Sequence, residues 1–485
     1  MDAEPRRRLF LGPQVRKLRR SMGLTQAQMA EGLEISASYL TLIERNQRPL
    51  TAQIILRLAE AYEVDVRTLA PGSDASVMVS LREVAADPML KSADLSYADL
   101  ADFAENFPQV ADAMVRLHSA YRETRETVQI MGENAHEGMA YGAGLAHSPV
   151  EETREALQAH DNYYGELEAA AADIKAKGAV RTDLPQALTT SLVNHLKATH
   201  NIDVQIMPYD VMKGLLRRFD QHKRRLLLSE LLTPSGRTFQ VAHLVGTLEA
   251  GELVRAVAQD ERLTSDASRA LYRVTLLNYL AGAIMLPYSR VLEAAERLRY
   301  DVDIMASRFG ASFEQVAHRL TTLRRPGEKG VPFFMVRVDR AGNMSKRFGG
   351  GVFPFARSGG SCPRWRLYEA FRVPGRVMVD VASLPEGQSF ITIARTVERP
   401  AAGAHAPGQE MVVGLGAELS QAGNLVYADG LDLSARGLAK TLTPIGVNCR
   451  VCPREDCNWR AVPPISGQLV IDATRRSMTP YSFVN

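Results

Sequence analysis

The chain has no long hydrophobic run, only four cysteines and little excess charge. Its longest apolar stretch, residues 276–288, is interrupted by Asn278 and is too short to span a bilayer. The basic N-terminus is not followed by the apolar segment that a secretory signal needs. A net charge of +3 on 485 residues does not by itself indicate a nucleic-acid-binding protein. We therefore expect a cytoplasmic, globular chain of about three or four domains.

Residues 18–48 carry the pattern of a helix-turn-helix. Thr25 and Gln28 have the spacing of a capping box that opens one short helix. That helix is expected to end near Leu33, and a tight turn leads to a second helix from Ser36. The second helix has apolar residues on one side and small or polar residues on the other, as a helix in a DNA major groove would. The alternative is a helical hairpin with a solvated face.

Basic residues gather around this segment. Seven of the first twenty residues are arginine or lysine, against two acidic residues. Such side chains would contact phosphates, whereas the small residues of the second helix would read bases through thymine methyl groups and hydroxyl contacts. One such module buries little surface, so we expect a homodimer or homotetramer on double-stranded DNA. The predicted DNA-binding residues are Arg16, Gln26, Ala37, Ser38, Thr41, Leu42, Arg45 and Arg48.

Hydropathy patterning divides the rest of the chain into helical and extended parts. A linker is expected at residues 71–74, and helical periodicity then runs from about residue 81 with an interruption at Pro108. One long helix is expected over residues 151–177, and alternating strands begin beyond Pro332. The other expected elements are extended runs at 204–207 and 225–232, helices at 239–248 and 268–285, and strands at 333–338, 376–384, 389–397, 410–419 and 424–433.

Residues 243–247 read His-Leu-Val-Gly-Thr, where the helix of a zinc metallopeptidase would read H-E-x-x-H. Leu244 replaces the general-base glutamate, Thr247 replaces the second histidine, and residues 272–277 offer no acidic third ligand. One ligand of three cannot hold zinc or activate its water, so we expect no enzyme activity. A peptidase-like pocket that has lost its catalytic groups can still bind a ligand. Two interpretations of His243 stay open: it is a buried core residue, or it lines the ligand pocket.

All four cysteines lie in the last third of the chain. In a cytoplasmic chain they are not a disulfide framework. Four thiolates can hold tetrahedral zinc or an iron–sulfur cluster. The C-x2-C-x4-C spacing with one remote cysteine fits a cluster slightly better, because zinc prefers paired C-x2-C knuckles. Four unrelated buried thiols are the alternative. The predicted metal ligands are Cys362, Cys449, Cys452 and Cys457.

Several long stretches give the chain a family resemblance. RRFDQHKRRLLLSELL, GVPFFMVRVDRAGNMSKRF, GGSCPRW and CRVCPREDCNWRAVPP resemble segments of the short-chain fatty-acyl transcriptional regulators. These proteins combine a Cro-type helix-turn-helix, a degenerate ImmA/IrrE peptidase-like domain and a characteristic C-terminal domain. The resemblance covers nearly the whole chain. It implies control by a short-chain acyl-CoA of genes such as those of the methylcitrate cycle, the glyoxylate shunt or propionyl-CoA carboxylation. It also implies a four-iron cluster held by the four cysteines.

The expected fold class is therefore multi-domain. An all-α helix-turn-helix precedes an α-rich, degenerate zincin-like α+β domain and a β-rich α+β C-terminal domain. The expected boundaries are 1–72 for the DNA-binding domain, 75–148 for a helical linker or oligomerisation region, 149–330 for the ligand-binding domain and 331–485 for the cysteine-containing regulatory domain. The competing interpretations are an antitoxin-like or phage-type repressor, a redox-sensing regulator without acyl-CoA response, and a residual metallopeptidase.

A coenzyme A thioester needs two kinds of site residue. Its phosphates need arginine or lysine, and its acyl end needs a small apolar pocket. Selection between acetyl and propionyl depends on one methylene, worth only ~1–3 kcal/mol, so the sequence does not predict the preferred acyl group. For each basic residue, a solvated face is the alternative. The candidates are Arg217, Arg218, Arg319, Lys346 and Arg347 for the phosphates, and His243, Tyr279, Tyr288 and Phe334 for the acyl end.

Overall fold

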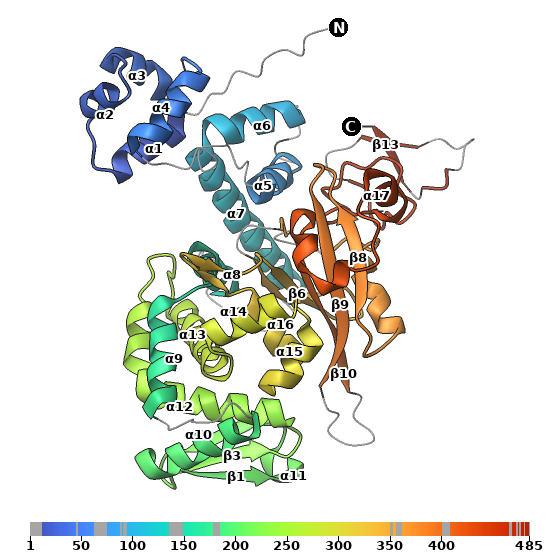
Figure 1. Ribbon diagram of the computed structural model, residues 1–485. Coiled ribbons are helices and arrows are strands. Elements are labelled where there is room, and N and C mark those ends of the chain that lie inside the picture. Colours follow the sequence, from blue (N-terminus) through green and yellow to red (C-terminus); the bar gives the residue numbers. More distant parts are fainter. Residues whose placement is uncertain are drawn as a thin grey trace. The chain divides into compact units, whose positions relative to one another are not determined.

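The computed structural model (Figure 1) divides into two compact units, residues 1–119 and 120–485, each of which is described by itself. The structure describes residues 12–44, 47–62, 75–87, 90, 95–134, 149–177, 185–349, 353–355, 361–399, 408–464, 468–471, 474, 477–479 and 481–484. The expected linker at residues 71–74 lies outside these ranges.

The first unit begins with the expected helix-turn-helix. The capping box is confirmed: Thr25 Oγ1 accepts a hydrogen bond from the Gln28 amide at 3.3 Å, and the Thr25 amide donates to Gln28 Oε1 at 2.9 Å. The second helix was predicted to start at Ser36; it starts at Ala37, and Ser36 Oγ caps it by accepting from the Tyr39 amide at 3.1 Å. Met29 and Leu40 lie in the core between the helices. The four helices are α1 (Gly12–Ser21), α2 (Gln26–Gly32), α3 (Ala37–Glu44) and α4 (Ala52–Tyr62).

A buried carboxylate joins the first three of these helices. Glu44, at the end of α3, is 2% exposed. Arg19 of α1 donates to both of its carboxylate oxygens, at 2.6 and 3.2 Å, and Gln26 of α2 donates at 2.8 Å. Burial would raise the pKa of Glu44, but the hydrogen bonds from Arg19 and Gln26 hold this pKa below its ordinary value. The charged carboxylate is therefore part of the folded helix-turn-helix.

Three further helices follow the helix-turn-helix domain. They are α5 (Ala75–Ala85), α6 (Tyr97–Asn106) and α7 (Pro108–Asn134). The predicted interruption at Pro108 is confirmed, because this proline is the first residue of α7, a position that needs no backbone N–H donor. Leu81, Leu100 and Val115 pack together in a small core of their own.

The second unit contains a helical domain with a small sheet. Its helices are α8 (Pro149–Ala159), α9 (Gly165–Lys177), α10 (Pro185–His200), α11 (Tyr209–Met212), α12 (Pro234–Val257), α13 (Asp266–Met285), α14 (Tyr288–Arg297), α15 (Val302–Phe309) and α16 (Phe313–Leu320). The sheet has the order β1-β3-β2 and consists of β1 (Asp203–Met207), β2 (Arg217–Asp220) and β3 (Arg225–Ser229), with β1 and β3 parallel. A short hairpin, β4 (Arg324–Arg325) and β5 (Glu328–Lys329), follows α16.

Two expectations for this domain need correction. The single long helix over residues 151–177 is wrong: Asp161 and Asn162 take φ values of 53° and 54°, which end α8 before α9 begins. Asp and Asn are the residues that tolerate this left-handed conformation best after glycine. Strand β2, which pairs antiparallel with β3, was not expected from the sequence. In contrast, the helix expected at 268–285 is confirmed as α13, and that at 239–248 lies within the longer α12.

The C-terminal domain is built on a six-stranded sheet of order β11-β8-β9-β10-β6-β7. Four of the expected strands are confirmed as β6, β8, β9 and β10. The stretch 424–433, which was expected to be a strand, instead contributes to two 3-10 turns. The elements are β6 (Phe334–Val338), β7 (Met344–Phe348), η3 (Arg366–Arg372), β8 (Met378–Ser383), β9 (Ser389–Arg399), β10 (Gln409–Glu418), η4 (Leu419–Asn424), η5 (Val426–Ala428), α17 (Ala435–Thr441) and β11 (Thr443–Pro444), followed by the hairpin β12 (Gln468–Val470) and β13 (Ser482–Val484).

One hydrophobic core joins the helical domain to this sheet. Leu244 and Leu280 belong to the same buried cluster as Met335 and Leu415, which alternate with residues of the opposite sheet face. Gly246 lets α12 approach α13, because a Cβ atom there would lie 2.8 Å from Leu280 Cδ2. The fold class expected from the sequence is thus confirmed.

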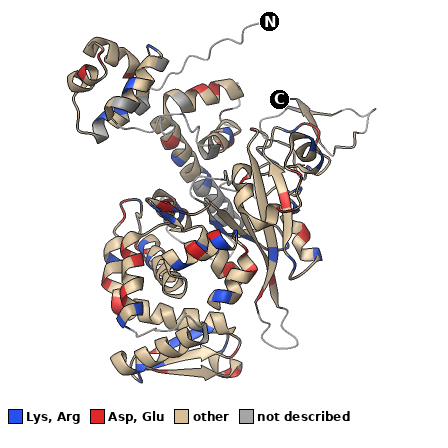
Figure 2. Cartoon of the chain, viewed as in Figure 1, with Lys and Arg blue, Asp and Glu red and all other residues tan. Residues whose placement is uncertain are grey.

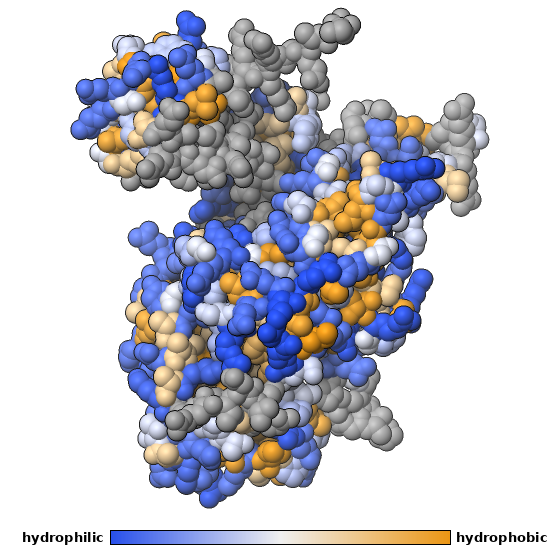
Figure 3. Space-filling view, viewed as in Figure 1, coloured by the Kyte–Doolittle hydropathy of each residue, from blue (hydrophilic) through white to orange (hydrophobic). Residues whose placement is uncertain are grey.

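Charge and hydropathy are mixed over the surface. Figure 2 shows lysine and arginine interspersed with aspartate and glutamate along the helices of the second unit. Figure 3 shows a mainly hydrophilic face with separate hydrophobic patches. Among the described residues, no single helix has the length and apolar composition of a membrane span; only α13 and α14 taken together, bent by 64°, meet that criterion.

We predict that Glu44→Gln destabilises the helix-turn-helix. Removing the charge leaves Arg19 without its buried partner, which we expect to lower the free energy of local opening by about 1–3 kcal/mol. Hydrogen exchange of peptides from residues 12–44 in the full chain measures this change.

In the wild type, protection should fall as the pH drops below the ordinary glutamate pKa of about 4.3, because Glu44 must then take up a proton. Glu34→Gln, which affects an exposed pair with Arg57, is the control. Equal effects of the two variants would contradict the assigned role of Glu44.

Candidate functional site

Helix α3 presents the small residues that were predicted to meet DNA. Ala37 and Ser38 are exposed, and Thr41 and Leu42 are half-buried. The Thr41 hydroxyl donates to the Ala37 carbonyl at 2.9 Å. Arg48 is exposed beyond the helix, whereas Arg45 lies outside the described residues. The structure therefore brings four of the predicted base-reading positions together on one helix.

Arg16 and Gln26, the other two predicted DNA contacts, are also bonded within the domain. The Gln26 amide donates to Glu44 Oε2 at 2.8 Å, and Arg16 donates to the Glu44 carbonyl at 2.6 Å. The Arg16 side chain nevertheless remains 41% exposed. Both residues therefore orient α1 and α2 against α3, and sequence reasoning missed Glu44 as their shared partner.

The degenerate peptidase motif lies on α12, where a positive charge from β2 acts on its remaining histidine. His243 is buried, and Thr247 Oγ1 lies 3.3 Å from its Nδ1 atom. Burial, followed by the positive charge of Arg217 on β2, lowers the pKa of His243 to about 4. His243 is therefore neutral at pH 7. Arg217 Nη1 is buried and has no hydrogen-bond partner among the described residues. A buried donor without a partner is a position where an anion or carbonyl oxygen can bind. The adjacent Arg218 is exposed.

Arg319, a candidate for the phosphates, lies beside Tyr279 and Tyr288, two candidates for the acyl end, but its polar atoms are bonded within the protein. Its guanidinium carbon lies 5.8 and 5.7 Å from the centroids of the Tyr279 and Tyr288 rings. Its Nη1 and Nη2 atoms donate to the two oxygens of Glu168 at 2.6 and 2.8 Å. Its Nε donates to the Leu286 carbonyl at 2.8 Å. Arg319 could therefore bind a phosphate only if Glu168 moved.

The two tyrosines have partners as well. The Tyr279 hydroxyl donates to Glu168 at 2.5 Å. The Tyr288 hydroxyl donates to the Glu328 carbonyl at 2.7 Å and accepts from the Arg325 amide at 2.8 Å. These bonds make the group a polar network inside the helical domain.

Three other candidates lie on the C-terminal sheet. Lys346 Nζ pairs with Glu314 at 2.6 Å, and Arg347 lies 3.5 Å from Glu151. Phe334 is fully buried against Phe353 and other aromatic residues, with ring centroids 4.6 Å apart for that pair. Because Phe334 alternates with Met335, it faces away from the core that contains Tyr279 and Tyr288. The structure therefore does not bring Phe334 together with these tyrosines.

The predicted cysteine ligands converge at one end of the C-terminal domain. Cys362, Cys452 and Cys457 are buried, and Cys449 is half-buried. Burial raises the pKa of the Cys362 and Cys452 thiols, while hydrogen bonds from backbone amides oppose this effect, among them that of Gly446 at Cys362. The loop after β11 thus lies against the segment that precedes η3, although 87 residues separate Cys362 from Cys449.

Arg460 organises the cysteine loop and was not foreseen. It donates to the carbonyls of Cys449 and Cys452 at 2.8 and 3.0 Å, and to that of Arg454 at 2.7 Å. It is only 2% exposed. In the sequence, an arginine three residues after a cysteine looks like any exposed charged residue. No sequence pattern therefore indicated that Arg460 is buried.

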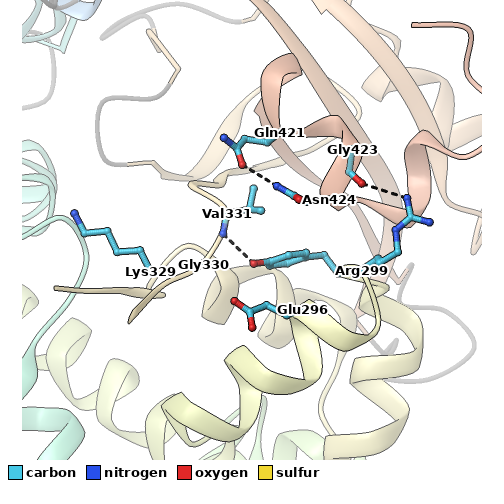
Figure 4. Close-up of a pocket in the computed structure, with 9 residues that line it drawn as sticks. Glu296, Arg299, Lys329, Gly330, Val331, Gln421, Gly423 and Asn424 are labelled. Carbon is cyan, nitrogen blue, oxygen red and sulfur yellow. Dashed lines mark hydrogen bonds between the residues drawn. The ribbon is translucent and has the colours of Figure 1, made fainter. Parts of the chain in front are cut away.

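A cavity of about 390 Å³ lies where the helical domain meets the C-terminal domain (Figure 4). Arg299 and Tyr300, which follow α14, line one wall and take φ values of 50° and 61°. The Tyr300 hydroxyl accepts from the Val331 amide at 3.0 Å, and Arg299 pairs with Asp429 at 2.8 Å. None of these residues was a site candidate in the sequence.

Comparisons with known proteins match nearly the whole chain. A helix-turn-helix family matches residues 15–69, an IrrE N-terminal-like domain matches 198–321, and the C-terminal domain of the short-chain fatty acyl coenzyme A regulators matches 322–481. The propionyl-CoA carboxylase regulator of Cereibacter sphaeroides is 38% identical over 481 residues, which are 99% of each chain. The HTH-type transcriptional regulator RamB of Mycobacterium tuberculosis is 39% identical over 97% of this chain and 98% of its own.

A solved structure of a Mycobacterium tuberculosis transcriptional regulator is also similar. It has a TM-score of 0.65 and 36% identity, and the match covers 69% of this chain and all of that one. Sequence identity of this extent, together with the three matched domains, identifies the family. The chain belongs to the short-chain fatty acyl coenzyme A regulators, a family of helix-turn-helix transcriptional regulators.

Proposed function

We propose that this protein is a transcriptional regulator of short-chain fatty acid metabolism whose operator affinity is set by a short-chain acyl-CoA. The observation that carries the proposal is the full-length similarity to the propionyl-CoA carboxylase regulator, which includes the DNA-binding, IrrE-like and C-terminal parts. The ligand would bind one conformation of the second unit more tightly. Because the protein is expected to bind DNA as an oligomer, that preference would change how paired α3 helices meet the operator.

The DNA contact proposed is the exposed side of α3. Ala37, Ser38, Thr41 and Leu42 supply methyl and hydroxyl groups for base edges, and Arg16, Arg45 and Arg48 supply charge for phosphates. Gln26 would act mainly by holding Glu44, which fixes the angle between α2 and α3.

The effector site proposed is centred on Arg217 and His243. Arg217 offers a buried N–H without a partner, suited to a phosphate or the thioester carbonyl of acyl-CoA. His243 is neutral at pH 7, so of these two residues only Arg217 carries positive charge. Arg218 would reach a more exposed phosphate, and Tyr279, Tyr288 and Arg319 would hold the frame around the site. Lys346 and Arg347 are proposed for the outer phosphates, although each is paired with a carboxylate that a ligand would have to displace.

We infer that the IrrE-like domain does not cleave peptides. Beyond the replacement of the glutamate by Leu244 and of the second histidine by Thr247, Arg217 brings a fixed positive charge to His243. A cation there opposes a zinc ion electrostatically. The relatives, which are transcriptional regulators, support the same inference.

For the four cysteines we propose a [4Fe–4S] cluster. The C-x2-C-x4-C spacing with one remote cysteine supports this proposal, because zinc prefers paired C-x2-C knuckles. Cys449 and Cys452 lie close enough to Cys362 for their charges to raise its pKa, so the remote cysteine belongs to the same group. The cluster would brace the loop that Arg460 holds.

We predict that Ser38→Glu weakens operator binding. The new carboxylate would face the DNA phosphates, and we expect an affinity loss of at least about tenfold, or 1.4 kcal/mol. Fluorescence anisotropy with duplexes selected from random sequence by the wild type measures it. Gln53→Glu makes the same charge change on an exposed position of α4 and is the control. Unchanged affinity in Ser38→Glu would remove α3 from the interface.

We predict that Arg217→Gln weakens acyl-CoA binding at least about tenfold, because one charged donor to the ligand is lost. Calorimetry with acetyl-, propionyl- and butyryl-CoA, on protein prepared without oxygen, gives the affinities. Arg225→Gln, at an exposed position of the neighbouring strand β3, should bind like the wild type. No heat with any of the three thioesters would refute the effector assignment and favour a repressor or a redox sensor.

We predict that protein purified without oxygen contains about four iron and four sulfide per chain. Replacing Cys449 by serine should lower both and abolish the broad visible absorption of the cluster. Elemental analysis and absorption spectra provide the measurement. Stoichiometric zinc without sulfide would exclude the cluster.

A further inference from the structure

Three metal-ligating side chains meet between α10 and α12, outside the sites described above. His195 lies in α10, His200 is the last residue of that helix, and Glu249 lies in α12. His200 Nε2 lies 3.0 Å from Glu249 Oε1, and His195 Nε2 contacts the same oxygen. The three ligand atoms all lie within 4.8 Å of one another.

The surroundings hold these side chains in place. Asn201 has a φ of 50°, which ends α10 directly after His200, and Arg224 donates a hydrogen bond to the His200 carbonyl. Thr199 Oγ1 lies 3.4 Å from His195 Nδ1, so the Nε2 atom is the one left to face the carboxylate. The imidazole rings stand at 79° to each other, with centroids 6.0 Å apart. These partners orient the imidazoles from outside, as second-layer groups do around metal sites.

The cluster is largely shielded from water. The side chains of His195, His200 and Glu249 are 8%, 20% and 14% exposed. Glu249 follows His243 by six residues, which places it roughly 120° around α12 from the peptidase motif. The group is therefore separate from the degenerate peptidase centre.

We propose that His195, His200 and Glu249 bind a zinc ion. Two imidazole nitrogens and one carboxylate oxygen are a common protein ligand set for zinc, in which water takes the fourth position. An ion there would bridge α10 to α12 through one carboxylate that both histidines already face. Zinc would thus fasten the helix that leads into the small sheet, which carries Arg217, to the helix that carries His243. This site does not depend on acyl-CoA binding.

X-ray absorption at the zinc edge of the full-length protein, after addition of one equivalent of zinc, tests the proposal directly. We expect a shell of nitrogen and oxygen at about 2.0–2.1 Å from the zinc. A shell of sulfur alone at about 2.3 Å would place the metal on the cysteines and overturn the proposal. This measurement needs no variant, so a folding defect cannot obscure it.

Variants give an independent test by chelator competition. Glu249→Gln and His195→Gln should each weaken zinc binding at least about tenfold, because one of three protein ligands is lost or neutralised. Zinc should also raise the melting temperature of the wild type but not of these variants. His160→Gln is the matched control, since His160 lies 3.3 Å from a carboxylate of Asp260 without a third ligand. If all the variants bound zinc like the wild type, the group would be a His–carboxylate–His hydrogen-bonded cluster only.

Discussion

The helical domain of the second unit depends on one buried ion pair, between Arg319 of α16 and Glu168 of α9. Their side chains are 3% and 5% exposed, so both charges have lost most of their hydration. Burial would lower the pKa of Arg319, but the adjacent carboxylate of Glu168 raises it and keeps the guanidinium charged. Removing one partner from such a pair typically costs 3–5 kcal/mol, because it leaves an uncompensated buried charge. The pair therefore acts as a constraint on where α9 and α16 can lie.

Further polar groups complete this constraint. Tyr279 bonds the same carboxylate, and its ring lies 5.2 Å from that of Tyr164, whose hydroxyl contacts Tyr272 at 2.7 Å. The Leu286 carbonyl, at the end of α13, accepts from Arg319. A buried network in which each member is satisfied favours one arrangement of the helices over others. It joins α9, α13 and α16, against which α12 packs with the degenerate peptidase motif.

The sequence predicted local features well and long-range contacts poorly. The capping box at Thr25 and the alternation in β8, β9 and β10 are local signals, and the structure confirms them. The failures have physical reasons. Asp161 and Asn162 broke a helix whose periodicity continued on both sides, and 424–433 alternated like a strand but turned into 3-10 helix. Glu168 and Arg319 are 151 residues apart, so no spacing pattern could join them. The same holds for Glu249 and its histidines.

The centre around His243, the proposed effector site, can be compared with the zinc centre of a metallopeptidase. In a metallopeptidase the zinc ion attracts an anionic oxygen and also activates water. Arg217 can do the first and not the second, because a guanidinium stays protonated and coordinates no hydroxide. Half-buried beside a neutral imidazole, its charge is screened less than at the surface. Replacing the metal by arginine on this scaffold therefore retains attraction for a negatively charged ligand while removing hydrolysis. That combination suits the proposed effector site, because a sensor must release its ligand unchanged.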